Sequence, residues 1–390
     1  MDRPLRGIRV VAFEQALSLP FGTYMLAEMG ADVVKIERRG RGDVIRGWDE
    51  AVHGLSTGFV WVNAGKRDVA VDMARPEGRE VVKRLALQAD VFVENFSPGV
   101  AARMGLADAD LRPLSPRLVY CSLSGYGQSG PYRDRKAYDL LVQGEAGVLL
   151  TSGYPEAPAR VGVPITDLIA GVNAALGVTL ALYERERTGQ GSFLDVSMFD
   201  GAVAWLGYFP QRIWHEGKEP PRTGMRHQYI TPYGPFQARD GRYLNLAVAS
   251  EDDWKRFCEQ VVRRPEWLAE PRFSSVSRRT RHKAEVDRLV EEAIAQEPLE
   301  EWERRLEAAR LPYGRVRPIA EVLEHPQLKS RRLVVDVQSE FGPLPWLRFP
   351  LAPPDAERRL PGLGEHTEEV LLEIGYGEAE ISALRAAEVI

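Results

Sequence analysis

Short apolar runs alternate with amphipathic stretches along the first part of the chain. Residues 7–13 (GIRVVAF) have the pattern of a buried strand. Residues 20–29 (PFGTYMLAEM) have a helical pattern, with Pro20 in the first turn and Gly30 directly after the last residue. A second strand pattern follows at residues 32–37 (DVVKIE). This order predicts a βαβ unit.

The alternation continues further along the chain. A helical pattern at residues 76–89 precedes strand patterns at 90–94 and 118–122, and a long apolar helix at 167–187 precedes a strand at 193–197. Strands that alternate with helices predict a parallel sheet covered on both faces. The expected fold class is therefore α/β.

The length predicts more than one domain, because 390 residues exceed what a single hydrophobic core usually serves. Beyond the parallel sheet, a Pro-, Gly- and Arg-rich stretch is typical of a linker, and the strand and charged helices after it indicate an α+β domain. We expect a large domain, a linker, a small α+β domain and a segment that returns to the large domain, over residues 1–215, 216–235, 236–330 and 331–390, respectively.

Composition and charge narrow the class of protein. With 51 basic and 56 acidic residues the net charge is −5, which favours neither nucleic acid nor an anionic membrane as a partner. The two cysteines, Cys121 and Cys258, cannot make a disulfide framework. No apolar run with the roughly 20 residues of a membrane span stands out. We expect a cytoplasmic globular enzyme.

Common cofactor motifs are absent from the sequence. No G-x-G-x-x-G follows the first strand, and neither a phosphate-binding P-loop nor a G-x-S-x-G nucleophile elbow occurs. None of the six histidines pairs with another ligand at helical spacing, and there is no C-x-x-C. The sequence therefore predicts no dinucleotide, nucleoside triphosphate or metal site.

Basic residues follow the predicted strands. Arg38, Arg39 and Arg41 come after the second strand, and Arg103 follows the strand at 90–94. The carboxyl ends of parallel strands are where α/β proteins bind ligands, and arginine suits phosphate. The alternative for each is an ordinary solvated surface charge.

Three acids near the middle of the chain are candidates for chemistry. Asp139 and Asp167 each also suit the start of a helix, where a carboxylate accepts free backbone N–H groups. Glu156 lies in a Gly- and Pro-punctuated loop, and loops often carry sites.

Six separated blocks, in order, resemble the class III CoA-transferase family, which includes formyl-CoA, carnitine and bile-acid CoA-transferases and the 2-methylacyl-CoA racemases. The blocks are ADVVKIER (31–38), VFVENFSPG (91–99), SLSGYGQSGP (122–131), GVPITDLIAG (162–171), DGRYL (240–244) and GEHTEEVLLEIGY (364–376).

The resemblance implies a Rossmann-like large domain, a smaller domain and a homodimer of two interlocked chains. It implies coenzyme A or acyl-CoA as substrate, with a small carboxylic acid as the second substrate and no permanently bound cofactor. The implied CoA contacts are Arg38 and Arg103 for the adenine and phosphates, together with Ser18, Asn95, Phe96, Ser124, Gly125 and Tyr126.

The resemblance also implies a catalytic carboxylate. The family's transferases carry an Asp nucleophile in a pattern like T-G-x-x-D-G-P-P, and residues 152–158 here (SGYPEAP) place Glu156 at that position. A carboxylate can attack the thioester, form a mixed anhydride and then carry CoA as a glutamyl thioester. Asp139 and Asp167 are the expected supporting acids.

Two other functions stay open. The racemase branch uses a His followed by an Asp, and Tyr138 stands at the His position here, so the base suited to neutral pH is missing. Because Glu replaces Asp, a non-catalytic CoA-binding protein is the third possibility. Side chains that could bind a distal carboxylate, or simply form a linker, are Arg222, Arg226, His227 and Tyr229.

Overall fold

The computed structural model describes residues 3–390 and divides them into two compact units. Unit 1 consists of the described part of Met1–Val148, with Val161–Gly207 and Pro326–Ile390, and unit 2 consists of Leu149–Arg160 and Tyr208–His325. From the sequence, residues 149–160 and 208–215 were instead expected to belong to the large domain. The reason for the difference is long-range pairing: Gly224 N donates to the Gly153 carbonyl at 2.7 Å, which ties the first of these segments to unit 2.

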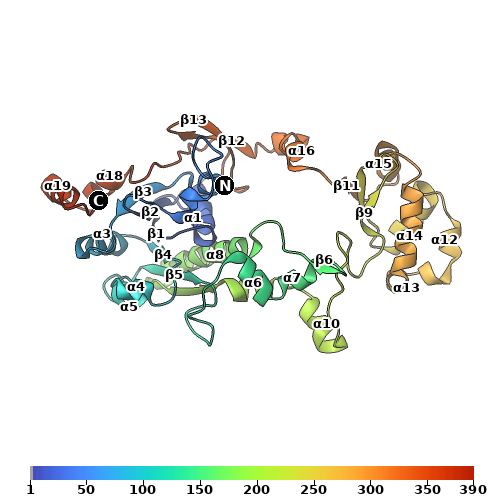
Figure 1. The fold of residues 1–390 in the computed structure, drawn as a ribbon, viewed down its shortest axis with the longest axis horizontal. Helices are drawn as coiled ribbons and strands as arrows, with labels where there is room; N and C mark the ends of the chain where they lie inside the picture. Colours follow the sequence, from blue (N-terminus) through green and yellow to red (C-terminus); the bar gives the residue numbers. More distant parts are fainter. Residues whose placement is uncertain (1–2) are drawn as a thin grey trace. The chain divides into compact units, whose positions relative to one another are not determined.

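The centre of unit 1 is a sheet of six parallel strands in the order β3-β2-β1-β4-β5-β8 (Figure 1). This confirms the predicted parallel sheet. The sequence analysis did not predict β3, because Arg67 and Asp68 at its start interrupt the apolar pattern. The strands are β1 (Arg9–Phe13), β2 (Asp32–Arg38), β3 (Arg67–Val71), β4 (Val91–Glu94), β5 (Val119–Ser124) and β8 (Phe193–Ser197).

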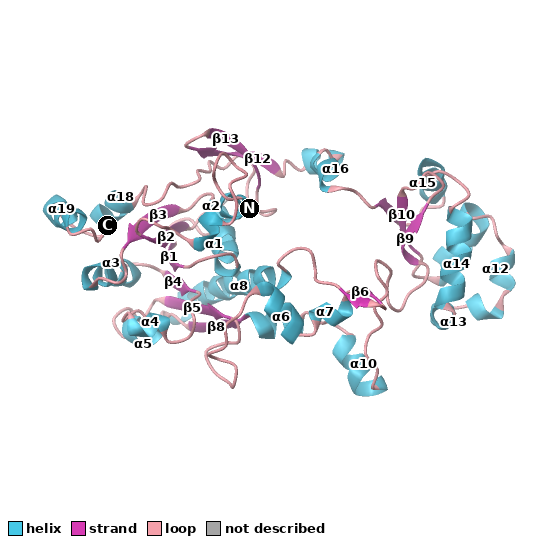
Figure 2. Ribbon diagram, viewed as in Figure 1, coloured by secondary structure: helices cyan, strands magenta, loops and turns pink. Residues whose placement is uncertain are grey.

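Helices cover both faces of this sheet, as the alternation along β1 shows. Val10 and Ala12 belong to one core cluster with α1 and α8, whereas Val11 and Phe13 belong to a second cluster with α3 and α18. Figure 2 shows these helices around the strands. The helices of unit 1 are α1 (Ser18–Glu28), α2 (Thr57–Asn63), α3 (Pro76–Leu87), α4 (Val100–Arg103), α5 (Asp108–Leu111), α6 (Asp139–Glu145), α8 (Ile165–Thr188), α9 (Met198–Ala204), α17 (Pro326–Ser330), α18 (Thr367–Glu373) and α19 (Glu378–Ala386).

Helices α1 and α8 cross with their backbones almost in contact. A Cβ atom added to Gly22 would lie 2.7 Å from the Gly171 carbonyl oxygen, and one added to Gly171 would lie 2.5 Å from the Ser18 carbonyl oxygen. Only glycine fits at both positions. Because residues four apart share one face of a helix, Asp167 lies one turn from this crossing, on the side of the first turn of α1.

Helix α8 is also long and apolar enough to cross a membrane, with a mean hydropathy of 1.7 over its most apolar window. No apolar run of this length was expected from the sequence, and α8 corrects that expectation. However, Ala174, Val178 and Leu182 on its inner face belong to the core cluster that includes the sheet, and the core helices of globular proteins pass the same test of length and composition.

The edge strand β3 is covered by a segment from the far end of the sequence. Ala70 N donates to Thr367 Oγ1 at 3.1 Å, His366 N donates to the Asp68 carbonyl at 3.0 Å, and Asp68 N donates to His366 Nδ1 at 3.1 Å. These bonds occupy backbone groups that would otherwise be an open sheet edge. The hairpin of β12 (Val334–Ser339) and β13 (Gly342–Leu347) precedes this segment.

Unit 2 contains a three-stranded antiparallel sheet in the order β11-β10-β9 and a group of helices. The expected Ser250 cap is present, because its Oγ accepts a hydrogen bond from Asp253 N at 3.1 Å. The elements are β6 (Gly153–Tyr154), β7 (Ala157–Pro158), α10 (Phe209–Glu216), β9 (Tyr233–Gln237), β10 (Tyr243–Ala247), α11 (Glu251–Arg256), α12 (Glu266–Ala269), α13 (Val276–Arg281), α14 (Lys283–Ile294), α15 (Leu299–Ala308), β11 (Tyr313–Arg315) and α16 (Ile319–Leu323), and α7 (Val148–Thr151) joins the two units.

Candidate active site

A cavity of about 750 Å³ lies at the carboxyl ends of β1, β2, β3 and β4 in unit 1. In the sheet, β2 lies on one side of β1 and β4 lies on the other side, so the strand order reverses at β1. Ligands of open α/β sheets bind where the order reverses, because the loops separate there. The cavity therefore lies at the expected binding edge of the sheet.

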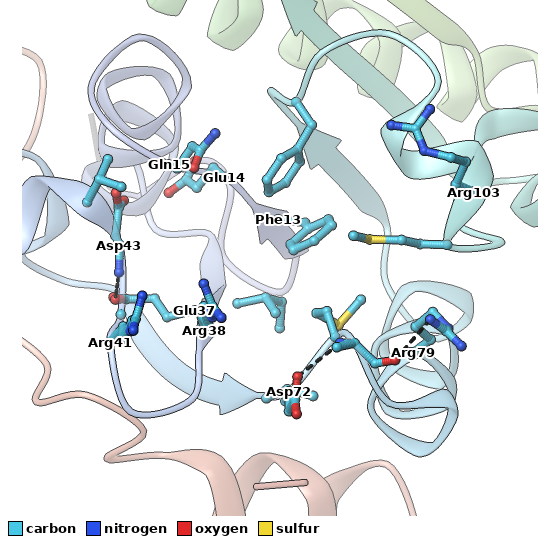
Figure 3. Close-up of a pocket in the computed structure, with 18 of the residues that line it drawn as sticks. Phe13, Glu14, Gln15, Glu37, Arg38, Arg41, Asp43, Asp72, Arg79 and Arg103 are labelled. Atoms are coloured by element: carbon cyan, nitrogen blue, oxygen red, sulfur yellow. Dashed lines mark hydrogen bonds between the residues drawn. The ribbon is translucent and has the colours of Figure 1, made fainter.

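Four arginines reach this cavity from different segments. Figure 3 shows Arg38 and Arg41 on one side and Arg79 and Arg103 on the other. Across residues 3–390, none of these four guanidinium groups forms an ion pair with a carboxylate. A group of uncompensated cations around one cavity suits a ligand with several phosphate charges.

The structure therefore brings the predicted Arg38 and Arg103 together. Arg79 was not predicted as a site residue. It lies on α3, which follows the unpredicted strand β3, so the start of this helix was not expected at the binding edge.

An aromatic pair forms part of the cavity wall. The rings of Phe13 and Phe96 lie 4.3 Å apart at an angle of 40°. Aromatic surfaces of this kind suit the flat face of a nucleotide base. Asn95, a predicted CoA contact, forms two hydrogen bonds with Gln15 in the neighbouring turn. Its Oδ1 accepts from Gln15 N and its Nδ2 donates to the Gln15 carbonyl, each at 2.9 Å.

The other predicted CoA contacts lie at the same edge of the sheet, outside the lining of the cavity. Ser18 begins α1 after β1, and the Ser124-Gly125-Tyr126 turn follows β5. Among the described residues, the buried Ser124 hydroxyl has no hydrogen-bond partner. Gly125 packs so closely against Ala137 that an added Cβ would lie 2.2 Å from the Ala137 Cβ. This contact holds the turn next to the segment that leads into Asp139.

Asp139 holds the start of α8. Its Oδ1 accepts from Thr166 N at 2.8 Å and from the Thr166 hydroxyl at 2.8 Å, and its Oδ2 accepts from Gln143 Nε2 at 2.7 Å. Both carboxylate oxygens are therefore occupied. One interpretation of the sequence was that Asp139 caps a helix. It does so, but the capped helix is α8 and not α6, which begins at Asp139.

Asp167, by contrast, caps no helix through its side chain. Within residues 3–390 no hydrogen bond to its carboxylate is found. Burial, and then the nearby charge of Asp139, raise the pKa of Asp167 to about 7. Among residues 3–390 this half-buried carboxyl group therefore has no hydrogen-bond partner, and its pKa is raised into the neutral range.

Glu156 lies in the turn between β6 and β7 in unit 2, and its side chain is exposed. Arg222 holds this hairpin, because its guanidinium donates to the Tyr154 carbonyl at 3.0 Å and to the Pro155 carbonyl at 2.7 Å. The exposed carboxylate of Glu156 is thus presented on an anchored turn.

The other side chains that could bind a distal carboxylate of a substrate also form local contacts. Arg226 lies 3.5 Å from the Asp287 carboxylate and also bonds Glu291. His227 Nδ1 accepts from Tyr229 N at 3.0 Å. These contacts favour the linker interpretation of this stretch.

Two buried carboxyl groups, those of Glu37 and Asp68, lie next to each other, and Glu37 is part of the cavity lining. Burial and the neighbouring Glu37 raise the pKa of Asp68 to about 9. Burial opposes ionisation of Glu37 too, but hydrogen bonds from Asp68 and from Arg46, at 2.8 Å, bring the pKa of Glu37 to about 2. The pair therefore shares one proton at neutral pH, carried by Asp68.

This shared proton makes stability depend on pH. An unfolded Asp loses its proton near pH 4, whereas folded Asp68 keeps it up to about pH 9, so the folded state binds one more proton between these values. Stability should fall with rising pH in that window, by at most about 1.4 kcal/mol per pH unit.

Asp68→Asn should remove this dependence, because an amide donates to Glu37 permanently and its oxygen can still accept from Gly364 N. Urea unfolding between pH 5 and 8.5 checks the slope. Asp68→Ala, which lacks the acceptor, should be destabilised at every pH. A parent protein with equal stability across the range would contradict the shared proton.

The model of CoA-transferase family III matches residues 5–367. The chain belongs to this family. It is 35% identical over 334 residues to acetyl-CoA:oxalate CoA-transferase from Acetobacter aceti, covering 85% of each chain. It is 35% identical over 389 residues to succinate–glutarate CoA-transferase from Agrobacterium fabrum, covering 95% of this chain and 96% of that protein. A CAIB/BAIF family protein from Brucella suis has a similar structure, with a TM-score of 0.83 and 32% identity over 96% of this chain and all of that one. The chain is a family III CoA-transferase, and CoA thioesters are its substrates.

Proposed function

We propose that this CoA-transferase moves CoA from an acyl-CoA to a small carboxylic acid through a CoA thioester formed on one of its own carboxyl groups, with the Rossmann-like unit 1 as the CoA-binding domain. The observation that carries the proposal is the cavity at the carboxyl ends of the strands, with an aromatic pair and four arginines that form no ion pair within residues 3–390. That arrangement provides cations for phosphates and a flat apolar surface for adenine.

Two carboxylates are candidates for the covalent step. The family resemblance implied Glu156 as the nucleophile, with Asp139 and Asp167 as supporting acids. The geometry favours Asp167, because it belongs to the same unit as the cavity, lies one turn from the α1 crossing and has no hydrogen-bond partner among the described residues. We propose Asp167 as the nucleophile, with Asp139 as the residue that positions it and Glu156 as the alternative.

The chemistry balances with a single carboxylate. Its oxygen attacks the thioester carbonyl and expels CoA thiolate, which leaves a mixed anhydride on the enzyme. The thiolate then attacks the enzyme carbonyl, releases the donor acid and leaves an enzyme–CoA thioester. The acceptor carboxylate repeats the two steps in reverse, so the new acyl-CoA leaves and the enzyme carboxylate is restored.

Small carboxylic acids are the proposed acceptors, since the relatives are named for oxalate, succinate and glutarate. A matrix of acetyl-CoA and succinyl-CoA against oxalate, succinate, glutarate and monocarboxylates tests this. We expect CoA transfer for at least one pair. CoA binding without transfer would favour a non-catalytic protein, and exchange of the α-proton of a 2-methylacyl-CoA in deuterated water would favour an isomerase.

We also propose a homodimer of interlocked chains in the cytoplasm. Leu176, Leu180 and Tyr183 form an apolar ridge on the outer side of α8, and each side chain is more than half exposed in the single chain. Contiguous apolar surface of this kind is typical of an interface. Interlocked chains separate only by unfolding, so sizing at nanomolar concentration should still give a dimer. A stable and active monomer would contradict this proposal.

A further inference from the structure

Asp43 connects two neighbouring walls of the cavity. Its Oδ1 accepts from Ala16 N at 2.8 Å and from Ile45 N at 3.1 Å, so one carboxylate oxygen bonds both the turn after β1 and the loop after β2. Its own N–H donates to Glu37 Oε2 at 2.6 Å. Glu14, Gln15 and Asp43 all line the cavity. Asp43 is therefore a cross-link between two segments that shape the binding surface.

The turn held by Asp43 needs such support. Ala16 has a φ angle of 60°, the left-handed region that residues other than glycine disfavour. Other side-chain bonds hold the neighbouring residues of this turn: Asn95 bonds Gln15, and Lys35, Lys66 and Thr23 bond Glu14. Among the described residues, the bond from Ala16 N to Asp43 is the one side-chain bond at Ala16 itself. Without Asp43, the turn can relax toward an ordinary conformation and move the Gln15 wall of the cavity.

The charge of Asp43 is neutralised locally. Its Oδ2 lies 2.8 Å from Lys35 Nζ, and Lys35 lies 3.6 Å from Glu14, which in turn bonds Lys66 at 2.7 Å. All four side chains have zero exposure, and two cations balance two acids. Removing one member leaves an unpaired buried charge, which perturbs its neighbours strongly.

We propose that Asp43 is a positioning residue for CoA: it fixes the 14–16 turn and the 41–47 loop relative to each other in the shape that CoA binds. The proposal rests on the proposed function, in which CoA fills this cavity. Simple electrostatics and positioning make opposite predictions here. Removing a negative charge from the wall should strengthen binding of a polyanion, whereas losing the cross-link should weaken it.

The test measures the dissociation constant of CoA by calorimetry for Asp43→Ala, which removes the oxygen that accepts from both Ala16 N and Ile45 N. We expect binding to weaken roughly tenfold or more, the usual effect of losing a charge-assisted hydrogen bond, with a smaller change in kcat at saturating acyl-CoA. Ala16→Gly/Asp43→Ala should recover part of the affinity, because glycine adopts a φ of 60° without strain. Unchanged or tighter CoA binding by folded Asp43→Ala would overturn the proposal.

Glu28→Ala is the matched control, since Glu28 also forms a buried ion pair in unit 1, with Arg358 at 2.6 Å, and does not line the cavity. It should lower thermal stability and leave the CoA dissociation constant unchanged. Equal weakening of CoA binding in Glu28→Ala would show a general structural effect and overturn the positioning role.

A second variant keeps the test valid if Asp43→Ala does not fold. Ala16→Val leaves all four buried charges in place but disfavours the left-handed turn, because a β-branched residue rarely adopts positive φ. It should weaken CoA binding, and unchanged affinity would overturn the proposal. Arg38→Ala tests the proposed CoA site separately from the positioning role of Asp43. If Arg38→Ala weakens CoA binding while the Asp43 and Ala16 variants do not, only the positioning role is contradicted. If none of the variants changes CoA affinity, the proposed CoA site itself is wrong.

Discussion

Asp167→Asn should reduce CoA transfer by more than about a thousandfold, the scale of losing a covalent nucleophile, while CoA still binds. The amide keeps the shape of the side chain but has no nucleophilic oxygen charge. Glu156→Gln is the matched variant, and its transfer rate should stay close to that of the parent. The reverse result would move the covalent step to Glu156, the nucleophile that the family resemblance implied.

The covalent intermediate itself can be mapped. Incubation with an acyl-CoA and no acceptor should accumulate the enzyme thioester, which hydroxylamine converts to a hydroxamate and borohydride reduces to an alcohol. We expect both modifications on the peptide that contains Asp167. If no carboxylate is labelled and both variants remain active, transfer does not proceed through a covalent intermediate, and an isomerase becomes the better interpretation.

The pH profile gives an independent check on Asp167. Its pKa is raised to about 7, and only the ionised form can attack a thioester. The value of kcat/KM should therefore fall as the pH decreases through about 7. Asp139→Asn removes the neighbouring negative charge and should move this midpoint to lower pH. A flat profile between pH 5.5 and 8 would contradict the assignment.

Arg38→Ala and Arg103→Ala should each weaken CoA binding by about 1.5–3 kcal/mol, the usual contribution of a charge-assisted hydrogen bond. The effect should be large because neither guanidinium has an acidic partner among residues 3–390, so each is available to a phosphate. Rising salt should also weaken CoA binding by the parent protein. Calorimetric titration with CoA measures both effects.

Arg39→Ala is the control for these variants. Arg39 follows Arg38 directly but lies outside the cavity lining, where its guanidinium donates to the Ile390 carbonyl at 3.1 Å and pairs with Glu388 at 3.7 Å. CoA affinity should be unchanged in this variant. Unchanged affinity in the Arg38 and Arg103 variants as well would return those two residues to the class of solvated surface charges.

The sequence predicted the features that depend on local pattern. The alternation of apolar strands and amphipathic helices gave the parallel sheet, and the position of Arg38 directly after a strand, together with the family resemblance, placed it at the binding edge. Phe13 was missed as a site residue because its pattern is that of any buried strand residue. Its partner Phe96 comes from a segment more than 80 residues away, and only the folded chain brings the two rings together.

Other features depend on contacts that no local pattern contains. The pattern around Asp167 is that of a helix cap, but Asp139, from another segment, already bonds the N-terminus of α8 and leaves the Asp167 carboxyl without that role. The raised pKa of Asp167 follows from burial, which the sequence does not show. The same limit applies to residues 149–160, since their place in unit 2 rests on long-range contacts such as the bond from Gly224 to Gly153.

The covering of β3 by residues 364–367 has a consequence for how the protein is made. The bond between Ala70 and Thr367 joins residues 297 positions apart. At about 5–20 residues per second, a ribosome needs roughly 15–60 s to synthesise the intervening chain. For that time the nascent sheet has an open edge, and the face that α18 later covers is exposed to water, although the second unit can already fold. Premature pairing of this edge with another nascent chain is therefore the main hazard during synthesis, and chaperones that shield sheet edges should matter more for the yield of this enzyme than its final stability suggests.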